Sequence, residues 1–210
     1  MERVDKLYLR DLFLRCLDAE YFTVENAGSF AMEREGGRLY VYFEKSDGAE
    51  DWENNFDFVA AESRTECARE CEPWYAHGGF LRVWNSILPY IDGALLDLDV
   101  REIITVGYSH GAALALLCHE YIWYSRPDIR MNISGYGFGC PRVIFGRVPR
   151  EKERWRCFHR VKNFDDIVTH LPPSAFGFRH VGREINIGGP GRYSRVDAHR
   201  AENYINEFER

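Results

Sequence analysis

The sequence predicts an α/β fold with a mostly parallel central sheet and helices on both faces. Three observations lead to this prediction. In the second half of the chain, short β-branched runs alternate with longer helical patterns, as in βαβ units. The 210 residues are 45% hydrophobic, which is enough to bury one sizeable core. No repeat and no low-complexity linker divides the chain. We therefore expect a single domain over residues 1–210.

The composition argues against several classes of protein. A formal net charge of -6 gives no basic field that would gather phosphates, so we expect no nucleic-acid partner. No run approaches the roughly 18 consecutive apolar residues of a membrane helix. The first residues lack the apolar stretch of a secretion signal. Cytoplasmic residence is thus the default expectation, with secretion left open if a signal has been trimmed.

Six cysteines are too sparse in a chain of this length for a disulfide framework. The spacing of Cys67 and Cys71 would put both thiols on one face of a helix. No second Cys/His pair lies nearby at the spacing of a zinc finger. We therefore expect mostly buried thiols, no metal ion and no cofactor.

The first half of the chain predicts two helices separated by a hairpin and a surface segment. Leucine, phenylalanine and cysteine recur at helical spacing over residues 4–17. Residues 29–34 and 38–43 flank a glycine pair and predict a hairpin at an edge of the sheet. The acidic, turn-rich residues 46–69 suit a mobile cover, and residues 80–95 carry the apolar stripe of a helix.

The second half predicts a regular alternation of strands and helices. A β-branched strand is expected over residues 102–106 and an Ala/Leu-rich helix over residues 110–124. Further strands are expected over residues 132–138, 155–161 and 183–187, and a closing helix over residues 198–208. Parallel strands follow from that order, because each crossover contains enough residues for a helix or a long loop.

The pentapeptide Gly107-Tyr108-Ser109-His110-Gly111 lies directly between the predicted strand and the Ala/Leu-rich helix. A serine hydroxyl is a weak nucleophile until a base takes its proton, and a tight turn lifts Oγ toward such a base. The two glycines let the strand and helix backbones approach each other. The helix N terminus aims backbone N–H groups at a developing oxyanion. Ser109 is therefore the candidate nucleophile, with the N–H of His110 as the first oxyanion donor.

In a site of this kind, an Asp or Glu and then a His follow the serine along the chain, and these two residues activate its hydroxyl. Asp165-Asp166 closes a predicted strand, where a parallel sheet presents side chains at its carboxyl edge. His199 stands at the start of the last predicted helix after a Gly/Pro-rich loop, which suits a histidine brought over the serine. His170 is too close to Asp166 in sequence to approach from a separate loop. The full candidates are His170, His180 and His199 as bases and Asp165, Asp166 and Asp197 as carboxylates.

Several separated blocks share the pattern of one family. They are Val41 to Ser46 with Asp51-Trp52, His77 to Phe80, the pentapeptide extended to Ala115, Gly137 to Val143, Val161 to Pro173, and His199 with Asn203 to Ile205. Over about residues 38–208 the chain resembles the class 3, fungal-type lipases of the α/β-hydrolase superfamily. The combination is far more specific than the pentapeptide alone.

The resemblance implies an α/β-hydrolase fold and a serine ester hydrolase in which Asp166 orients His199 toward Ser109. It also implies that Ser46 supplies a second oxyanion N–H beside His110, and that the segment around residues 50–57 forms a lid. The expected partner is a small-molecule or lipid ester, acylglycerol-like, with transient contact at a lipid interface. Acyl-chain length, headgroup preference and oligomeric state are left open.

Two alternatives to this function stay open on the sequence. One is a non-catalytic protein that keeps the fold and holds an acyl group or another ligand in the crevice above the sheet. The other is a phospholipase or thioesterase that uses the same three residues on a different ester. Each predicts the same fold, so only chemistry separates them.

Overall fold

The computed structural model describes residues 5–24, 28–44, 60–62, 74–147 and 152–210. Four features of the sequence analysis lie outside these ranges: Ser46, the lid segment 50–57, Cys67 and Cys71. Within the described ranges, no helix has the length and apolar character needed to cross a bilayer.

A seven-stranded sheet forms the centre of the molecule, in the order β1-β2-β3-β6-β7-β9-β11. Its strands are β1 Phe22–Val24, β2 Gly28–Glu35, β3 Arg38–Phe43, β6 Glu102–Tyr108, β7 Ile133–Phe138, β9 Phe158–Lys162 and β11 Arg183–Asn186. All neighbours from β3 to β11 pair in parallel, whereas β1, β2 and β3 pair antiparallel. The sheet is therefore mostly parallel, as predicted, and β1 extends the edge beyond the predicted hairpin.

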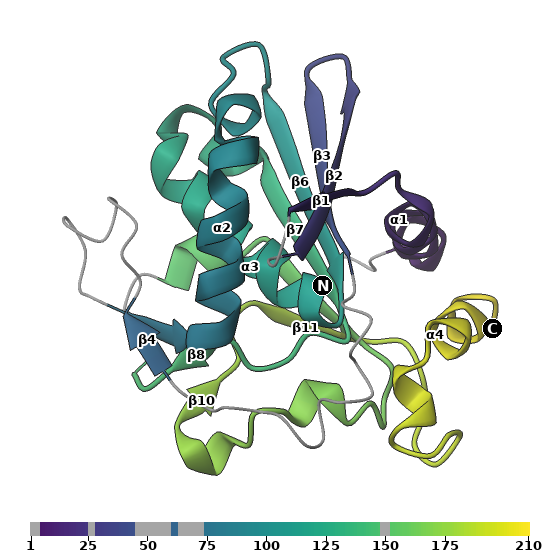
Figure 1. Cartoon of the computed structure of the whole chain (residues 1–210). Helices are drawn as coiled ribbons and strands as arrows, with labels where there is room; N and C mark the ends of the chain where they lie inside the picture. Colours follow the sequence, from purple (N-terminus) through teal and green to yellow (C-terminus); the bar gives the residue numbers. More distant parts are fainter. Residues whose placement is uncertain (1–4, 25–27, 45–59, 63–73, 148–151) are drawn as a thin grey trace.

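Helices cover both faces of this sheet, as Figure 1 shows. Helices α2 (Gly78–Leu95) and α3 (His110–Ser125) lie on one face, and α1 (Lys6–Asp18) and α4 (Ala201–Phe208) lie on the other. The loops contain short 3-10 helices: η3 Pro127–Asn132, η4 Lys152–Trp155, η5 Val168–His170, η6 Ser174–Phe176 and η7 Asp197–His199.

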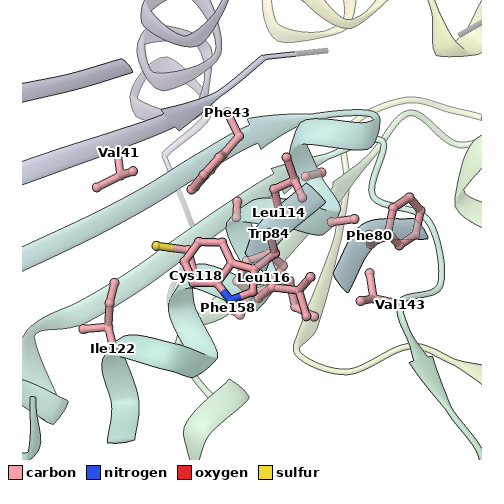
Figure 2. Close-up of a cluster of buried hydrophobic side chains, with 14 of the residues drawn as sticks. Val41, Phe43, Phe80, Trp84, Leu114, Leu116, Cys118, Ile122, Val143 and Phe158 are labelled. Carbon is pink, nitrogen blue, oxygen red and sulfur yellow. The ribbon is translucent and has the colours of Figure 1, made fainter. Parts of the chain in front are cut away.

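The core consists of two apolar layers, one on each side of the sheet. Strand β3 shows the alternation that separates them, because Val41 and Phe43 belong to the layer under α2 and α3, and Tyr42 to the opposite layer. Figure 2 shows the first layer, with Phe43, Trp84 and Leu114 among the labelled side chains. Helix α3 is buried nearly all round between Gly111 and Glu120, the pattern of a helix inside a core. This packing gives the turn before α3 a rigid support.

A second, smaller antiparallel sheet has the order β10-β8-β5-β4. Its strands are β4 Ala60–Glu62, β5 Tyr75–His77, β8 Ile144–Phe145 and β10 Phe178–Arg179. The sequence analysis did not predict this sheet, because runs of two or three residues are too short to show an alternating pattern. The sheet joins β5, which leads into α2, to the segment that follows β7, and the N–H of His77 donates to the carbonyl of Val143 at 2.9 Å.

Two predicted boundaries differ from the structure by three residues. The strand expected from residue 155 begins at Phe158, because η4 runs up to Trp155. The closing helix expected from residue 198 is divided: η7 ends at His199, and Arg200 is extended (φ -68°, ψ 139°) before α4 begins. The break separates His199 from α4, so its side chain is not committed to the face of a regular helix.

Candidate active site

The turn between β6 and α3 holds Ser109 in an unusual backbone conformation. Its φ and ψ are 57° and -119°, and it is the one non-glycine residue with positive φ in the described part of the chain. Such conformations cost about 1–3 kcal/mol and persist only where the surroundings enforce them. Here the N–H of Ser109 donates to the carbonyl of Phe138 at 2.9 Å, and its carbonyl accepts from the N–H of Ala112 at 3.0 Å.

The two glycines of the pentapeptide allow this turn to form. A Cβ at Gly107 would lie well under 3.0 Å from the carbonyl oxygen of Gly111. A Cβ at Gly111 would lie equally close to the carbonyl oxygen of Phe43 in β3. Real Cβ atoms do not approach backbone oxygens so closely, so the contact between strand and helix requires glycine at both positions.

Ser109, His199 and Asp166 meet at the carboxyl edge of the sheet. The Oγ atom of Ser109 lies 2.8 Å from Nε2 of His199. On the other side of the ring, Nδ1 lies 2.8 Å and 3.0 Å from the two carboxylate oxygens of Asp166. Because an ionised carboxylate can only accept, Nδ1 carries the proton and Nε2 accepts the serine hydroxyl hydrogen. The structure thus brings together the three residues that were assigned as nucleophile, base and acid.

Asp166 is fully buried and receives two further hydrogen bonds besides that from His199. The N–H of Val168 donates to Oδ1 at 2.9 Å, and the hydroxyl of Tyr204 donates to Oδ2 at 2.5 Å. Burial, and then the charge of Asp166, raises the pKa of Tyr204 well above its usual range, so the hydroxyl keeps its proton and acts as a donor. Donors to the charged form let a carboxylate remain buried.

His199 is positioned by contacts to its backbone and to its ring. The Tyr108 hydroxyl donates to the carbonyl of His199, and the two rings stack with centroids 5.2 Å apart. The Asn163 amide donates to the carbonyl of Ala198 at 3.0 Å. An ion pair of 2.6 Å between Arg192 and the buried Glu207 ties the preceding loop to α4. These contacts hold the loop that carries the His199 imidazole in place.

Gly139 makes room for the pair formed by Asp166 and His199, and the sequence analysis did not assign it a role. Its φ is +59°, and a Cβ there would lie 2.8 Å from Cε1 of His199 and 2.9 Å from Oδ2 of Asp166. The only signal in the sequence was its place in the block from Gly137 to Val143, and a glycine pattern alone does not reveal which side chains approach it.

The other candidate bases and acids have different partners. Nζ of Lys162 lies 3.1 Å from Nε2 of His170, and His180 donates from Nε2 to the carbonyl of Thr169 at 2.7 Å. Asp165 accepts from the N–H of Gly191 at 2.6 Å, and Asp197 accepts from the hydroxyl of Ser194 at 2.6 Å. These residues brace the loops around the site and do not join the chain of hydrogen bonds to Ser109.

His110, the predicted oxyanion donor, is the first residue of α3. Its N–H therefore lies at the helix N terminus, where the helix dipole favours negative charge. Its ring packs beside Phe80 with centroids 5.4 Å apart. Burial, and then the nearby His77, lowers the pKa of His110 to about 4, so its imidazole is neutral near pH 7. Ser46, the second predicted donor, lies outside the described residues.

A family model described as lipase (class 3) matches residues 40–176, which is more than half of the chain. The chain belongs to the class 3 lipase family. Among its relatives is a lipase from Rhizomucor miehei, 27% identical over 163 residues. Another is a secreted mono- and diacylglycerol lipase from Fusarium solani, 28% identical over 160 residues. These alignments cover 71% and 72% of this chain but 41% and 45% of the relatives, so the chain spans less than half of their length.

Solved structures agree with this assignment at the level of the fold. The chain is similar to the triacylglyceride lipase of Rhizomucor miehei, with a TM-score of 0.74 and 21% identity over 89% of this chain and 82% of that one. The class 3 lipase chain described here therefore has the α/β-hydrolase fold, as the resemblance implied.

Proposed function

We propose that this chain is a carboxylic ester hydrolase that cleaves acylglycerol-like esters through an acyl-enzyme. The observation that carries the proposal is the unbroken chain of hydrogen bonds from Ser109 through His199 to Asp166, with no link longer than 3.0 Å. The names of the relatives support the substrate class, since one is a mono- and diacylglycerol lipase and another a triacylglyceride lipase.

In the acylation step, Oγ of Ser109 attacks the ester carbonyl carbon while its proton passes to Nε2 of His199. The imidazolium that forms is stabilised by Asp166, which also fixes the ring tautomer. The carbonyl oxygen becomes an oxyanion, and the N–H groups at the N terminus of α3, beginning with His110, stabilise it. His199 then gives its proton to the leaving alcohol as the ester bond breaks.

In the deacylation step, water takes the place of the alcohol. His199 removes a proton from the water, and the resulting hydroxide attacks the acyl carbon of the ester on Ser109. Collapse of the second tetrahedral intermediate releases the carboxylic acid, and the proton on His199 returns to Oγ. By the resemblance, Ser46 serves as the second oxyanion donor in both steps.

A Ser109→Ala variant tests the proposal directly. It should fold normally and hydrolyse a short p-nitrophenyl ester with kcat/KM lowered by about 10⁴-fold or more. Ser86→Ala is the matched control, because this hydroxyl bonds only to the carbonyl of Arg82 on the exposed side of α2. The control should keep wild-type turnover. Equal turnover by Ser109→Ala and wild type would reject the proposal.

Labelling by a fluorophosphonate separates an enzyme from a protein that only binds acyl groups. An activated serine attacks the phosphorus and forms a stable adduct, which mass spectrometry locates at Ser109. A protein that only binds ligand would take up no label. We expect full labelling of the wild type and none of Ser109→Ala.

The substrate class is tested by comparing acylglycerols, phospholipids and acyl thioesters of one chain length. We expect the acylglycerol to have the highest kcat/KM. A micellar and a monomeric form of the same acylglycerol further test the expected contact with a lipid interface, which predicts faster turnover of the micellar form. A preference for phospholipid or thioester would replace the proposed substrate and leave the roles of the three residues unchanged.

A further inference from the structure

A cavity lies at the opposite edge of the sheet from Ser109. Its volume is about 360 Å³, and it is lined by residues around Trp155 and Arg156 before β9 and by Val181 to Arg183 at the start of β11. Arg183 pairs with His159 at the amino end of β9, whereas Ser109 follows the carboxyl end of β6. A molecule in this cavity would therefore not meet an ester at the catalytic edge.

Two arginines, Arg156 and Arg183, line the cavity together with one carboxylate residue, Glu153. Arg183 is exposed and makes no ion pair with any residue that the structure describes. Among the described residues, Arg156 pairs with Glu153 at 3.6 Å with both side chains largely exposed, and such pairs contribute little. His180 also lines the cavity. Burial, and then the charge of Arg160, lowers the pKa of His180 to about 3, so its imidazole is neutral near pH 7.

The wall behind the cavity is rich in hydrogen-bond donors that lack acceptors. Trp155 is almost fully buried, and within the described ranges its indole N–H has no acceptor. The guanidinium carbon of Arg154 lies 4.0 Å from the centre of the Trp155 ring, and Nε and Nη2 of Arg154 are also without acceptors there. The nearest carboxylate, Glu120, lies 3.8 Å from Nη1 of Arg154. Indole and guanidinium groups donate only, so Trp155 and Arg154 add donors and positive charge behind the cavity, while these buried atoms do not reach its surface.

Residues 142–200 include all the residues that line the cavity, and this segment is positively charged although the whole chain is negatively charged. Residues 142–200 contain 13 Lys and Arg against 6 Asp and Glu, a net charge of +7 in a chain whose total is -6. Part of this charge is paired, for example between Arg160 and Glu184 at 3.1 Å. The exposed Arg156 and Arg183 belong to this set, and their charge raises the local concentration of anions at the cavity.

We propose that the cavity is a binding site for a phosphate group, held by the side chains of Arg156 and Arg183 against the Trp155 wall. Guanidinium groups match the oxygens of phosphate in pairs, which a single ammonium group does not. The phosphate belongs either to a soluble phosphate monoester or to a phospholipid headgroup. The site is separate from the proposed hydrolase centre, and it requires no turnover.

Isothermal titration with inorganic phosphate, at an ionic strength held constant with chloride, tests the site. We expect saturable binding of one phosphate with Kd on the order of 1 mM or below. Arg183→Gln and Arg156→Gln should each weaken it by about tenfold, and Arg183→Lys should weaken it less because the charge is kept. Arg101→Gln is the matched control, since it removes an exposed arginine at the same edge of the sheet but outside the cavity, and it should bind as the wild type does.

A second experiment distinguishes the two sources of phosphate. Glycerol phosphate is titrated as the soluble ligand, and sedimentation with phosphatidylcholine vesicles, with and without phosphatidic acid, tests the headgroup. Binding in either arm that Arg183→Gln weakens by about tenfold supports the site. Ser109→Ala should bind phosphate like the wild type, which separates this proposal from the hydrolase. No saturable phosphate binding in any arm, or binding that neither arginine variant weakens, would overturn it.

Discussion

The two ends of helix α3 each carry a buried polar cluster, and the clusters differ in how well their atoms are satisfied. At the first end, Ser109, His199 and Asp166 are linked by hydrogen bonds of 2.8–3.0 Å. At the other end, Glu120 and Arg154 are 3.8 Å apart, and both side chains have atoms without partners among the described residues. Both clusters contain fully buried groups, such as Asp166 in the first and Arg154 in the second, so burial alone does not distinguish them.

The contrast shows what keeps the atoms of a buried polar group in fixed positions. A network in which every member is bonded fixes the positions of its atoms, as chemistry at Ser109 demands. A buried ion pair at 3.8 Å whose donors lack acceptors gains little electrostatic energy from the pairing, and burying its two charges costs desolvation free energy. We therefore expect substitutions in the first cluster to abolish activity, and substitutions in the second to change stability with pH.

The largest effect should come from Asp166→Asn. The amide carries no charge to stabilise the imidazolium and favours the wrong tautomer of His199, so kcat should fall by about 10⁴-fold. Asp165→Asn is the control, because the neighbouring carboxylate bonds to the N–H of Gly191 on the surface. Initial rates on a p-nitrophenyl ester measure both. Comparable losses in the two variants would contradict the assignment of Asp166.

The next effect should come from Gly139→Ala. The new Cβ would lie 2.8 Å from Cε1 of His199, so the ring must shift, and a misplacement of about 1 Å at a catalytic group lowers kcat by about 10²-fold. Gly146→Ala is the control that distinguishes the steric contact with His199 from the cost of the backbone conformation. Gly146 also has a positive φ (+74°), but a Cβ there would meet open space. Both variants should lose roughly 1 kcal/mol of unfolding free energy, and only Gly139→Ala should lose activity. An active Gly139→Ala would show that His199 is less tightly packed than the structure indicates.

A smaller effect is expected from Tyr204→Phe, which removes the hydroxyl that donates to Asp166. A buried charged acceptor then loses one of its donors, so kcat should fall about tenfold and stability by about 1.5–3 kcal/mol. Tyr193→Phe is the matched control, since in the described part of the chain that hydroxyl is buried without a partner. Its removal should be neutral or stabilising. Urea denaturation and kinetics together check both variants.

The smallest effect concerns the far end of α3. Burial raises the pKa of Glu120 to about 7 from an ordinary 4.5, although Arg154 opposes the shift. A carboxyl whose folded pKa is raised contributes stability that is complete below the unfolded pKa and is lost as pH rises through about 7. Relative to wild type, Glu120→Gln should therefore gain about 1–2 kcal/mol between about pH 5 and about pH 8. The exposed Glu202→Gln should show no such trend, and a flat difference for Glu120→Gln would contradict the shift.

Much of the fold could be predicted because its long elements carry strong patterns. The run from Glu102 to Val106 and the Ala/Leu-rich helix after it need only local propensity and burial, and the structure has both. The small second sheet could not be predicted, because strands such as Ile144–Phe145 depend on neighbours far away in the chain. The break at Arg200 was missed for a similar reason, since a helical pattern continues across it.

The sequence by itself determined the nucleophile candidate, because a glycine-flanked serine between a strand and a helix is a local arrangement. It also narrowed the base and the acid to a few residues by their order along the chain. The resemblance to class 3 lipases then singled out Asp166 and His199. What required the tertiary structure was the distances that join these side chains to Ser109, and the positions of Tyr204 and Gly139 beside them. These contacts join residues 27 to 90 positions apart, and their geometry is set by how the loops pack at one edge of the sheet rather than by any local pattern.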